Sequence, residues 1–267
     1  MALDNIPRST VYNSALPEIK RRDTWWVQPL AVVIVFTAFI IYTTFRTFEN
    51  DFYDVAKYGY LSPFYSPTIS VNWMIAGKHF SPAIFILPIP LLFRTTCYYY
   101  RKAYYRAFFQ DPTACAVKEP FKRPKYTGER QFPFILQNVH RYAFYLAAIV
   151  MVVLWYDAVI ACTASNADGA GRHFSMGVGS IIYLVNVVLL SLYTFSCHSW
   201  RHLTGGCLNC YSTNSDTKTR HGMWERITHL NENHALWAWC SLISVAVTDI
   251  YTRFVATGAI TDIRFFG

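Results

Sequence analysis

The sequence is poor in charge. Only 15% of its 267 residues are Asp, Glu, Lys or Arg, against roughly 25% in an ordinary soluble domain. Hydrophobic residues make up 53%, which excludes a disordered chain, because so much apolar surface cannot stay solvated. The net charge of +8 does not indicate a nucleic-acid-binding protein, since the positive residues lie in a few stretches between long apolar runs. These features are typical of a polytopic membrane protein.

Two further patterns are missing. The 7 cysteines are an odd number scattered through the chain, so no secretory disulfide framework is implied. Residues 1–23 lack the charged region, short apolar stretch and cleavage site of a signal peptide. Lys20, Arg21 and Arg22 lead directly into an apolar segment, which predicts a first span with a cytoplasmic N-terminus. No internal repeat is evident.

Five segments are apolar and long enough to cross a bilayer, which needs about 20 residues. The predicted spans are residues 25–45, 80–100, 132–159, 174–200 and 235–255. The second holds Pro82, Pro88 and Pro90 and is predicted to be a kinked helix. Most Lys and Arg residues fall before the first span and in the loops 94–130 and 201–233, which places those parts on the cytoplasmic side. We therefore expect an all-α, single-domain membrane bundle of five transmembrane helices.

The densest chemical signal follows the fourth span. His198 and His202 are four residues apart and share a helix face, and Cys207 and Cys210 form a C-x-x-C whose two thiolates could bind one metal. His140 and His234 begin the third and fifth spans on the same side of the membrane. The predicted metal ligands are Cys197, His198, His202, Cys207, Cys210 and His234; His140 gathers with them at the cytoplasmic end, and His229 is nearby.

Several interpretations of this set stay open. A single Cys or His at a membrane surface usually only packs or snorkels. Two Cys and two His suit a Rieske-type [2Fe–2S] cluster, paired His suit b haem, and the same ligands suit a structural zinc ion. On the opposite side, His79 and His173 could hold a second haem or only make interfacial hydrogen bonds.

Two carboxylates lie near the outer ends of spans. Ionisable groups at membrane depth are costly and often functional, so Asp157 and Asp249 are candidates for a proton relay or for structural ion pairs. Arg253 follows Asp249 by four residues, which favours a structural pair there. Asp157 has no cation near it in the sequence and is the predicted catalytic residue.

Four stretches resemble a known family. Residues 25–29, 60–67, 94–106 and 197–206 are similar to the five-helix membrane-anchor subunit of bacterial succinate dehydrogenase, respiratory complex II. The resemblance runs from about Trp25 to Cys240. It implies a multi-pass protein of the bacterial cell membrane, docked to a flavoprotein and an iron–sulfur subunit. It also implies electron transfer from succinate to menaquinone or ubiquinone, with the flavin chemistry on a partner.

The resemblance also bears on the cofactor. The familiar dihaem anchors use a His in the first helix, whereas Trp25 to Phe45 contains none. One branch of the family carries a membrane-embedded Rieske-type [2Fe–2S] cluster, which fits the thiols at 197–210 better. A cytochrome b anchor with the same role and a non-redox membrane protein with a zinc site are the alternatives.

A quinone needs an apolar slot, aromatic walls and hydrogen-bond donors. Residues of these types lie near the cytoplasmic surface, and they are also what the resemblance suggests. The predicted quinone site consists of Trp25, Trp26, Gln28, Arg141 and Tyr142. The alternative for the two Trp residues is anchoring in the interfacial aromatic belt. The basic loop that begins at Arg94 is expected to meet a partner subunit or anionic lipid.

Overall fold

Four long apolar helices and one broken helix make up the bundle. The computed structural model describes residues 24–68, 74–75, 78–79, 81–110, 134–166, 171–206, 208 and 210–266. The long helices are α1 (Val27–Glu49), α5 (His140–Ile160), α6 (Val178–Phe195) and α9 (His234–Ala256). The broken one consists of α2 (Ala83–Ile86), α3 (Pro88–Thr96) and α4 (Tyr98–Phe109). Counted as one span, it brings the total to the predicted five and confirms an all-α membrane bundle.

The second span is bent, as predicted, and the bend lies beyond its prolines. The chain turns by 79° at Cys97, where the backbone is extended between α3 and α4. Pro88 instead occupies the first turn of α3, where its missing N–H breaks no helical hydrogen bond. The predicted kink in this span is therefore confirmed, but it does not lie at a proline. The prolines start helical segments, and a cysteine marks the bend.

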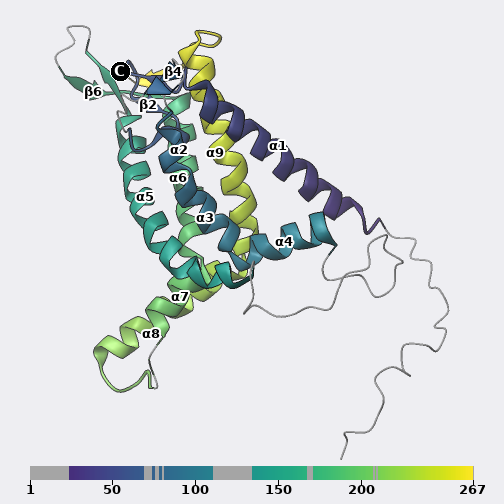
Figure 1. Ribbon diagram of the computed structural model, residues 1–267. Coiled ribbons are helices and arrows are strands. Elements are labelled where there is room, and N and C mark those ends of the chain that lie inside the picture. Colours follow the sequence, from purple (N-terminus) through teal and green to yellow (C-terminus); the bar gives the residue numbers. More distant parts are fainter. Residues whose placement is uncertain are drawn as a thin grey trace, which may run out of the picture.

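The helices differ in how closely they pack. α3, α5, α6 and α9 stand side by side, whereas α1 runs obliquely and diverges from them toward its N-terminal end, where it packs on α4 (Figure 1). Buried Phe93, Tyr100, Phe144 and Tyr193 fill the core between these helices near the bend. The splayed α1 leaves one side of the bundle open.

The two ends of the bundle carry different structures. One end holds α4, α7 (His198–Gly205) and α8 (Ser215–Glu232), and we call it the inner end (Figure 1). The opposite, outer end carries short antiparallel strand pairs. They are β1 (Asp54–Val55) with β2 (Tyr60–Leu61), β3 (Met74–Ile75) with β4 (Lys78–His79), β5 (Thr163–Ser165) with β6 (Arg172–Phe174), and β7 (Met176–Gly177) with β8 (Arg264–Phe266). The 3-10 helix η1 (Pro63–Tyr65) lies in the loop after β2, and η2 (Phe134–Val139) precedes α5.

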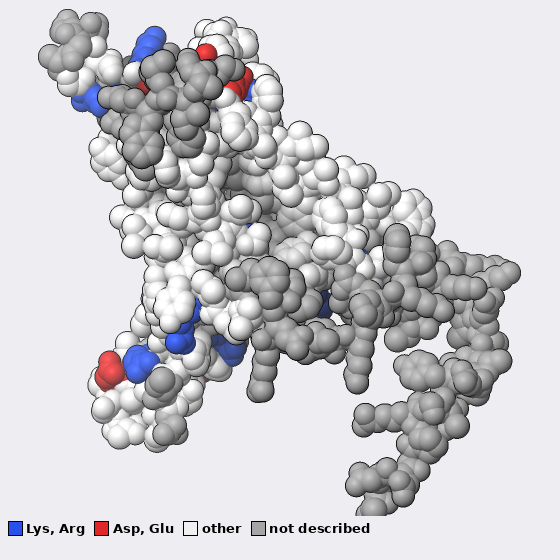
Figure 2. Space-filling view, viewed as in Figure 1, with Lys and Arg blue, Asp and Glu red and all other residues white. Residues whose placement is uncertain are grey.

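The surface agrees with a membrane location. In Figure 2 the visible Lys, Arg, Asp and Glu side chains gather toward the two ends, and an almost uncharged band separates them. The cytoplasmic placement of the N-terminus stays a prediction, and residues 1–23 lie outside the described part of the chain.

A buried ion network ties α1 to α9 at the outer end. Arg253 donates to Asp249 (2.8 Å) and to Glu49 (2.7 Å), and Asp249 also accepts hydrogen bonds from Tyr42 and Ser62. Asp249 is fully buried and Arg253 is 3% exposed. This network, which we call the outer clamp, fixes α1 at the end where it meets the bundle.

Candidate metal centre and adjoining cavity

Two histidines and two cysteines meet at the inner end. The Nε2 atom of His140 lies 3.1 Å from the Sγ atom of Cys197, and the Nε2 atom of His234 lies 3.4 Å from the Sγ atom of Cys97. His140 and both cysteines are buried, and His234 is half-buried. We call these four residues the Cys/His cluster. They begin α5 and α9 or lie in the breaks between α3 and α4 and between α6 and α7.

Helix breaks direct both cysteines into the bundle. Cys97 (φ −63°, ψ 129°) and Cys197 (φ −64°, ψ 142°) share one extended conformation, each as the residue preceding a new helix. Their surroundings also match: Phe93-x-x-Thr96-Cys97-x-x-Tyr100-Arg101 corresponds to Tyr193-x-x-Ser196-Cys197-x-x-Trp200-Arg201. The sequence therefore contains a short repeat, contrary to expectation. It is only nine residues long, too short to stand out without the structure.

The aromatic residue at the start of the repeat stacks on a histidine in both copies. Phe93 stacks on His140 with ring centroids 4.9 Å apart, and Tyr193 stacks on His234 at 5.1 Å. The hydroxyl residue of the repeat contacts the Nδ1 atom of a histidine in both copies. Thr96 Oγ1 lies 2.8 Å from Nδ1 of His140, and Ser196 Oγ lies 2.7 Å from Nδ1 of His234. Each imidazole is therefore held on one face and at both nitrogens, as metal-binding histidines usually are.

A third histidine borders the cluster. The ring of His198 stacks on that of His140 at 5.4 Å, and donor atoms of His140, Cys197 and His198 lie within 4.8 Å of one another. His198 is exposed at the inner surface. Partial desolvation of its ring, followed by the influence of nearby His202, lowers the pKa of His198.

Burial also controls the thiol of Cys197. Desolvation, followed by the influence of Cys97, raises the pKa of Cys197 to about 12. This thiol therefore keeps its proton at neutral pH unless a metal ion displaces it. A metal ion that displaced the thiol proton would gain two ligands, the sulfur and the facing imidazole nitrogen.

The predicted metal ligands divide into two groups. Cys197, His198 and His234 meet at the site together with His140, which the sequence placed nearby. The structure does not bring His202 or Cys210 into these contacts: both are exposed, and the Cys210 thiol lies beside Ser212. Cys207 lies outside the described residues. The roles of these three as ligands stay predictions.

Sequence reasoning missed Cys97, although a signal was present. Its Thr-Cys dipeptide matches Ser196-Cys197, with an aromatic residue four positions before each Cys and an Arg four positions after. The other histidines lie elsewhere: His229 pairs with Glu232 on α8 (3.8 Å), and His173 of β6 contacts Asn166 (2.8 Å). The side chain of His79 lies outside the described part of the structure.

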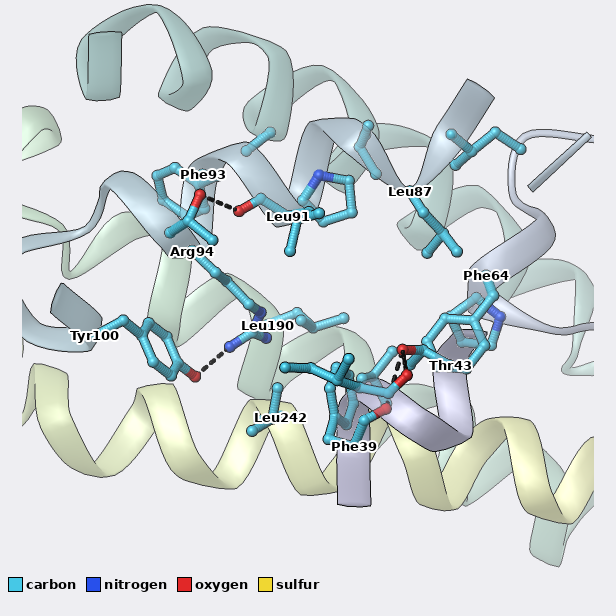
Figure 3. Close-up of a pocket in the computed structure, with 18 of the residues that line it drawn as sticks. Phe39, Thr43, Phe64, Leu87, Leu91, Phe93, Arg94, Tyr100, Leu190 and Leu242 are labelled. Atoms are coloured by element: carbon cyan, nitrogen blue, oxygen red, sulfur yellow. Dashed lines mark hydrogen bonds between the residues drawn. The ribbon is translucent and has the colours of Figure 1, made fainter. Parts of the chain in front are cut away.

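A cavity of about 570 Å³ opens under the splayed α1 (Figure 3). Its walls are apolar and aromatic and include Phe36, Phe39, Phe64, Phe93, Leu190, Tyr193 and Leu242. Phe93 and Tyr193 border both the cavity and the Cys/His cluster. Arg94 reaches into the same region, where it donates to Tyr100 and, at 3.1 Å, to Ser241, and lies over the Tyr193 ring.

The predicted quinone residues do not line this cavity. Trp25 is half-buried with the Arg106 guanidinium 5.9 Å from its ring, whereas Trp26, Gln28, Arg141 and Tyr142 are exposed. They belong to the N-terminal ends of α1 and α5, which lie apart in Figure 1. The cavity does not reach either group, and a shared quinone site stays a prediction.

The two predicted carboxylates have different environments. Asp249 belongs to the outer clamp. Asp157 is half-buried near the outer end of α5 and accepts a hydrogen bond from the buried hydroxyl of Ser66. Leu154, one turn earlier on α5, lines the cavity. Asp157 is thus a carboxylate near the cavity with no salt bridge in the described part of the structure.

Comparison with known proteins identifies the family. A family model described as actinobacterial succinate dehydrogenase subunit SdhC matches residues 27–258. The chain belongs to this family. A chain of the Mycobacterium smegmatis Sdh1 complex in the apo form is 45% identical, superposes with a TM-score of 0.81, and is aligned over 94% of this chain and 96% of its own. A search of curated proteins gave no match.

The family fixes the coarse function. The chain is a membrane-anchor subunit of succinate dehydrogenase, a multi-pass protein of the bacterial cytoplasmic membrane that partners the flavoprotein and iron–sulfur subunits. The predicted relationship is confirmed, and the alternative of a membrane protein unrelated to a redox complex is set aside.

Proposed function

We propose that this SdhC subunit carries electrons from the docked iron–sulfur subunit through a Rieske-type [2Fe–2S] cluster to a membrane quinone. The observation that carries the proposal is the largely buried set of two cysteines and two histidines at the inner end, in which two copies of one short motif supply the cysteines. A Rieske centre takes two Cys on one iron and two His on the other. When bound, it would supply one-electron transfer.

The donor types match such a centre. Cys97, Cys197, His140 and His234 supply two sulfur and two nitrogen atoms, and the hydroxyl of Tyr193 beside them is buried without a hydrogen-bond partner in the described chain. An acceptor in the site would satisfy that hydroxyl. The thiol–imidazole hydrogen bonds would give way to metal–ligand bonds.

Two alternatives make different demands on the site. The S···N separations of 3.1 and 3.4 Å are close to the edge of a single tetrahedral zinc site, roughly 3.5 Å for typical Zn–S and Zn–N bonds. A two-iron cluster needs the Cys and His atoms further apart. Haem is less suited, because both Nε2 atoms face thiols and neither His140 nor His234 lines the cavity. We favour iron over zinc because the chain anchors an oxidoreductase, and zinc does not transfer electrons.

The cavity is our first candidate for the quinone site. Its aromatic and aliphatic walls suit an isoprenoid quinone. Arg94 and Tyr193 lie where the cavity meets the cluster, so they would hold the head group oxygens there. Tyr193 would also shorten the electron path, because its ring contacts both His234 and the cavity.

A second candidate follows from exposure at the inner end. Trp26, Gln28, Arg141 and Tyr142 are exposed at the N-terminal ends of α1 and α5, and Trp25 is half-buried next to Trp26. A partner subunit covering this surface would complete a pocket there. Arg94→Gln and Trp26→Ala separate the two candidates: the variant that raises the quinone KM identifies the site in use. For Asp157 we propose proton exchange between the cavity and the outer side.

Metal analysis of the purified three-subunit complex tests the proposal. We expect iron and acid-labile sulfide beyond the content of the partner subunits, and loss of that excess in Cys97→Ser and in Cys197→Ser. Cys162→Ser is the matched control, since Cys162 is a partly buried thiol at the outer end that donates to Ala158. Zinc in place of the excess iron would overturn the proposal. Full iron content in both variants would move the site to Cys207 and Cys210.

A further inference from the structure

Each cysteine of the cluster follows a hydroxyl residue that holds the opposite half of the site. Thr96 precedes Cys97 but contacts His140, which faces Cys197. Ser196 precedes Cys197 but contacts His234, which faces Cys97. The two halves are therefore interlocked through Thr96 and Ser196, which no cofactor would touch directly.

The hydrogen bonds determine which way each hydroxyl points. Thr96 Oγ1 lies 2.6 Å from the carbonyl oxygen of Leu92, one turn earlier on α3. A carbonyl only accepts, so the hydroxyl proton goes to Leu92 and the oxygen must accept from Nδ1–H of His140. Ser196 does the same, with its proton directed at the carbonyl of Tyr193 (3.1 Å).

This assignment fixes the tautomer of both histidines. If Nδ1 carries the proton, Nε2 presents a bare lone pair. That lone pair faces the thiol of Cys197 in one half and of Cys97 in the other. The sulfur of Cys197 also accepts from the backbone N–H of Ser199 (3.4 Å), which leaves its own proton to be donated to His140. Every hydrogen bond around His140 is thus consistent with Nε2 as the ligand atom.

We infer that Thr96 and Ser196 are positioning residues, which hold His140 and His234 in the Nδ1–H tautomer and lower the reduction potential of the bound cluster. The inference rests on the proposed function. An acceptor on the far nitrogen makes an imidazole a more basic ligand. A more basic ligand stabilises the oxidised metal, so removal of the acceptor raises the potential.

EPR-monitored redox titration of the purified complex tests this. In Thr96→Val and Ser196→Ala we expect the ratio of reduced to oxidised cluster at a fixed poise to rise about tenfold, which is about 59 mV for a one-electron couple. Thr96→Ser and Ser196→Thr keep the hydroxyl and should restore the original potential. Thr248→Val is the control, because Thr248 is fully buried but donates only within α9, to Ser244 (2.9 Å).

The outcomes separate the inference from the function beneath it. Wild-type potential and cluster content in both hydroxyl-free variants would overturn the inference and leave the cluster standing. If Thr96→Val loses the cluster, retention in Thr96→Ser supports the inference, whereas equal loss in Thr96→Ser overturns it. Absence of the cluster from the wild-type complex overturns the proposed function first, and the inference with it.

Discussion

At the outer end, Asp249, Arg253 and Glu49 bury charges that satisfy one another. At the inner end, four neutral side chains face one another, and none of them supplies a positive charge. They are Cys97, Cys197, His140 and His234. The first arrangement pairs its charges without a ligand and joins α1 to α9. The second arrangement is that of side chains which bind a metal. From this contrast we propose that the outer end of the bundle serves assembly and that the inner end serves electron transfer.

The largest effect is expected at the inner end. Cys97→Ser should reduce succinate:quinone reductase activity at least 100-fold, because a hydroxyl cannot replace a thiolate ligand. Succinate oxidation with an artificial electron acceptor at the flavoprotein should remain. Assaying both activities on one preparation checks this. Equal loss of both would mean that Cys97 serves assembly, and the contrast between the ends would fail.

Breaking the outer clamp should give the reverse pattern. Asp249→Asn leaves Arg253 with Glu49 as its remaining carboxylate partner in the clamp. Loss of one member of a buried pair typically costs about 3–5 kcal/mol, which is an upper limit here. We expect a lower thermal midpoint and a lower yield of complex, with a normal iron content per assembled complex. Thermal unfolding in detergent together with metal analysis measures both. Normal stability with lost turnover would make Asp249 a relay residue instead.

Asp157 should show an intermediate effect. Asp157→Asn removes a proton-exchanging group but keeps an acceptor for Ser66. We expect turnover with quinone to fall about tenfold, less than the roughly 100-fold or more that is usual for a general acid–base group, while stability and cluster content stay normal. Asp157→Glu should recover part of the turnover. A fall in stability as large as that of Asp249→Asn would assign Asp157 to the scaffold.

The smallest effect concerns Cys210. Hydrogen bonds from Ser212 and Thr213 lower the pKa of this exposed thiol to about 7. Its thiolate fraction should therefore rise as pH rises through 7, and the rate of alkylation by iodoacetamide should rise with it. We expect the alkylated complex to keep its quinone reductase activity. If Cys210 were alkylated only after removal of iron, it would instead be a metal ligand.

Sequence patterns predicted the bundle better than the site. Five spans followed from apolar length alone, since a bilayer sets that length regardless of packing. The bend at Cys97 did not follow, because proline is the usual sequence sign of a kink and a cysteine in extended conformation is not. His140 and His234 could be placed at one end from helix polarity. Their pairing with Cys97 and Cys197 needed the packing of four helices, which no local pattern records.

The central claim is that two histidines of this chain bind a two-iron cluster at the inner end. Pulsed EPR of the reduced complex, with the histidines labelled with ¹⁵N, measures this most directly. The account predicts two strongly coupled histidine nitrogens, and one fewer in either His140→Cys or His234→Cys where the cluster is retained. A cluster signal without coupled histidine nitrogen beyond those of the partner subunits would contradict it.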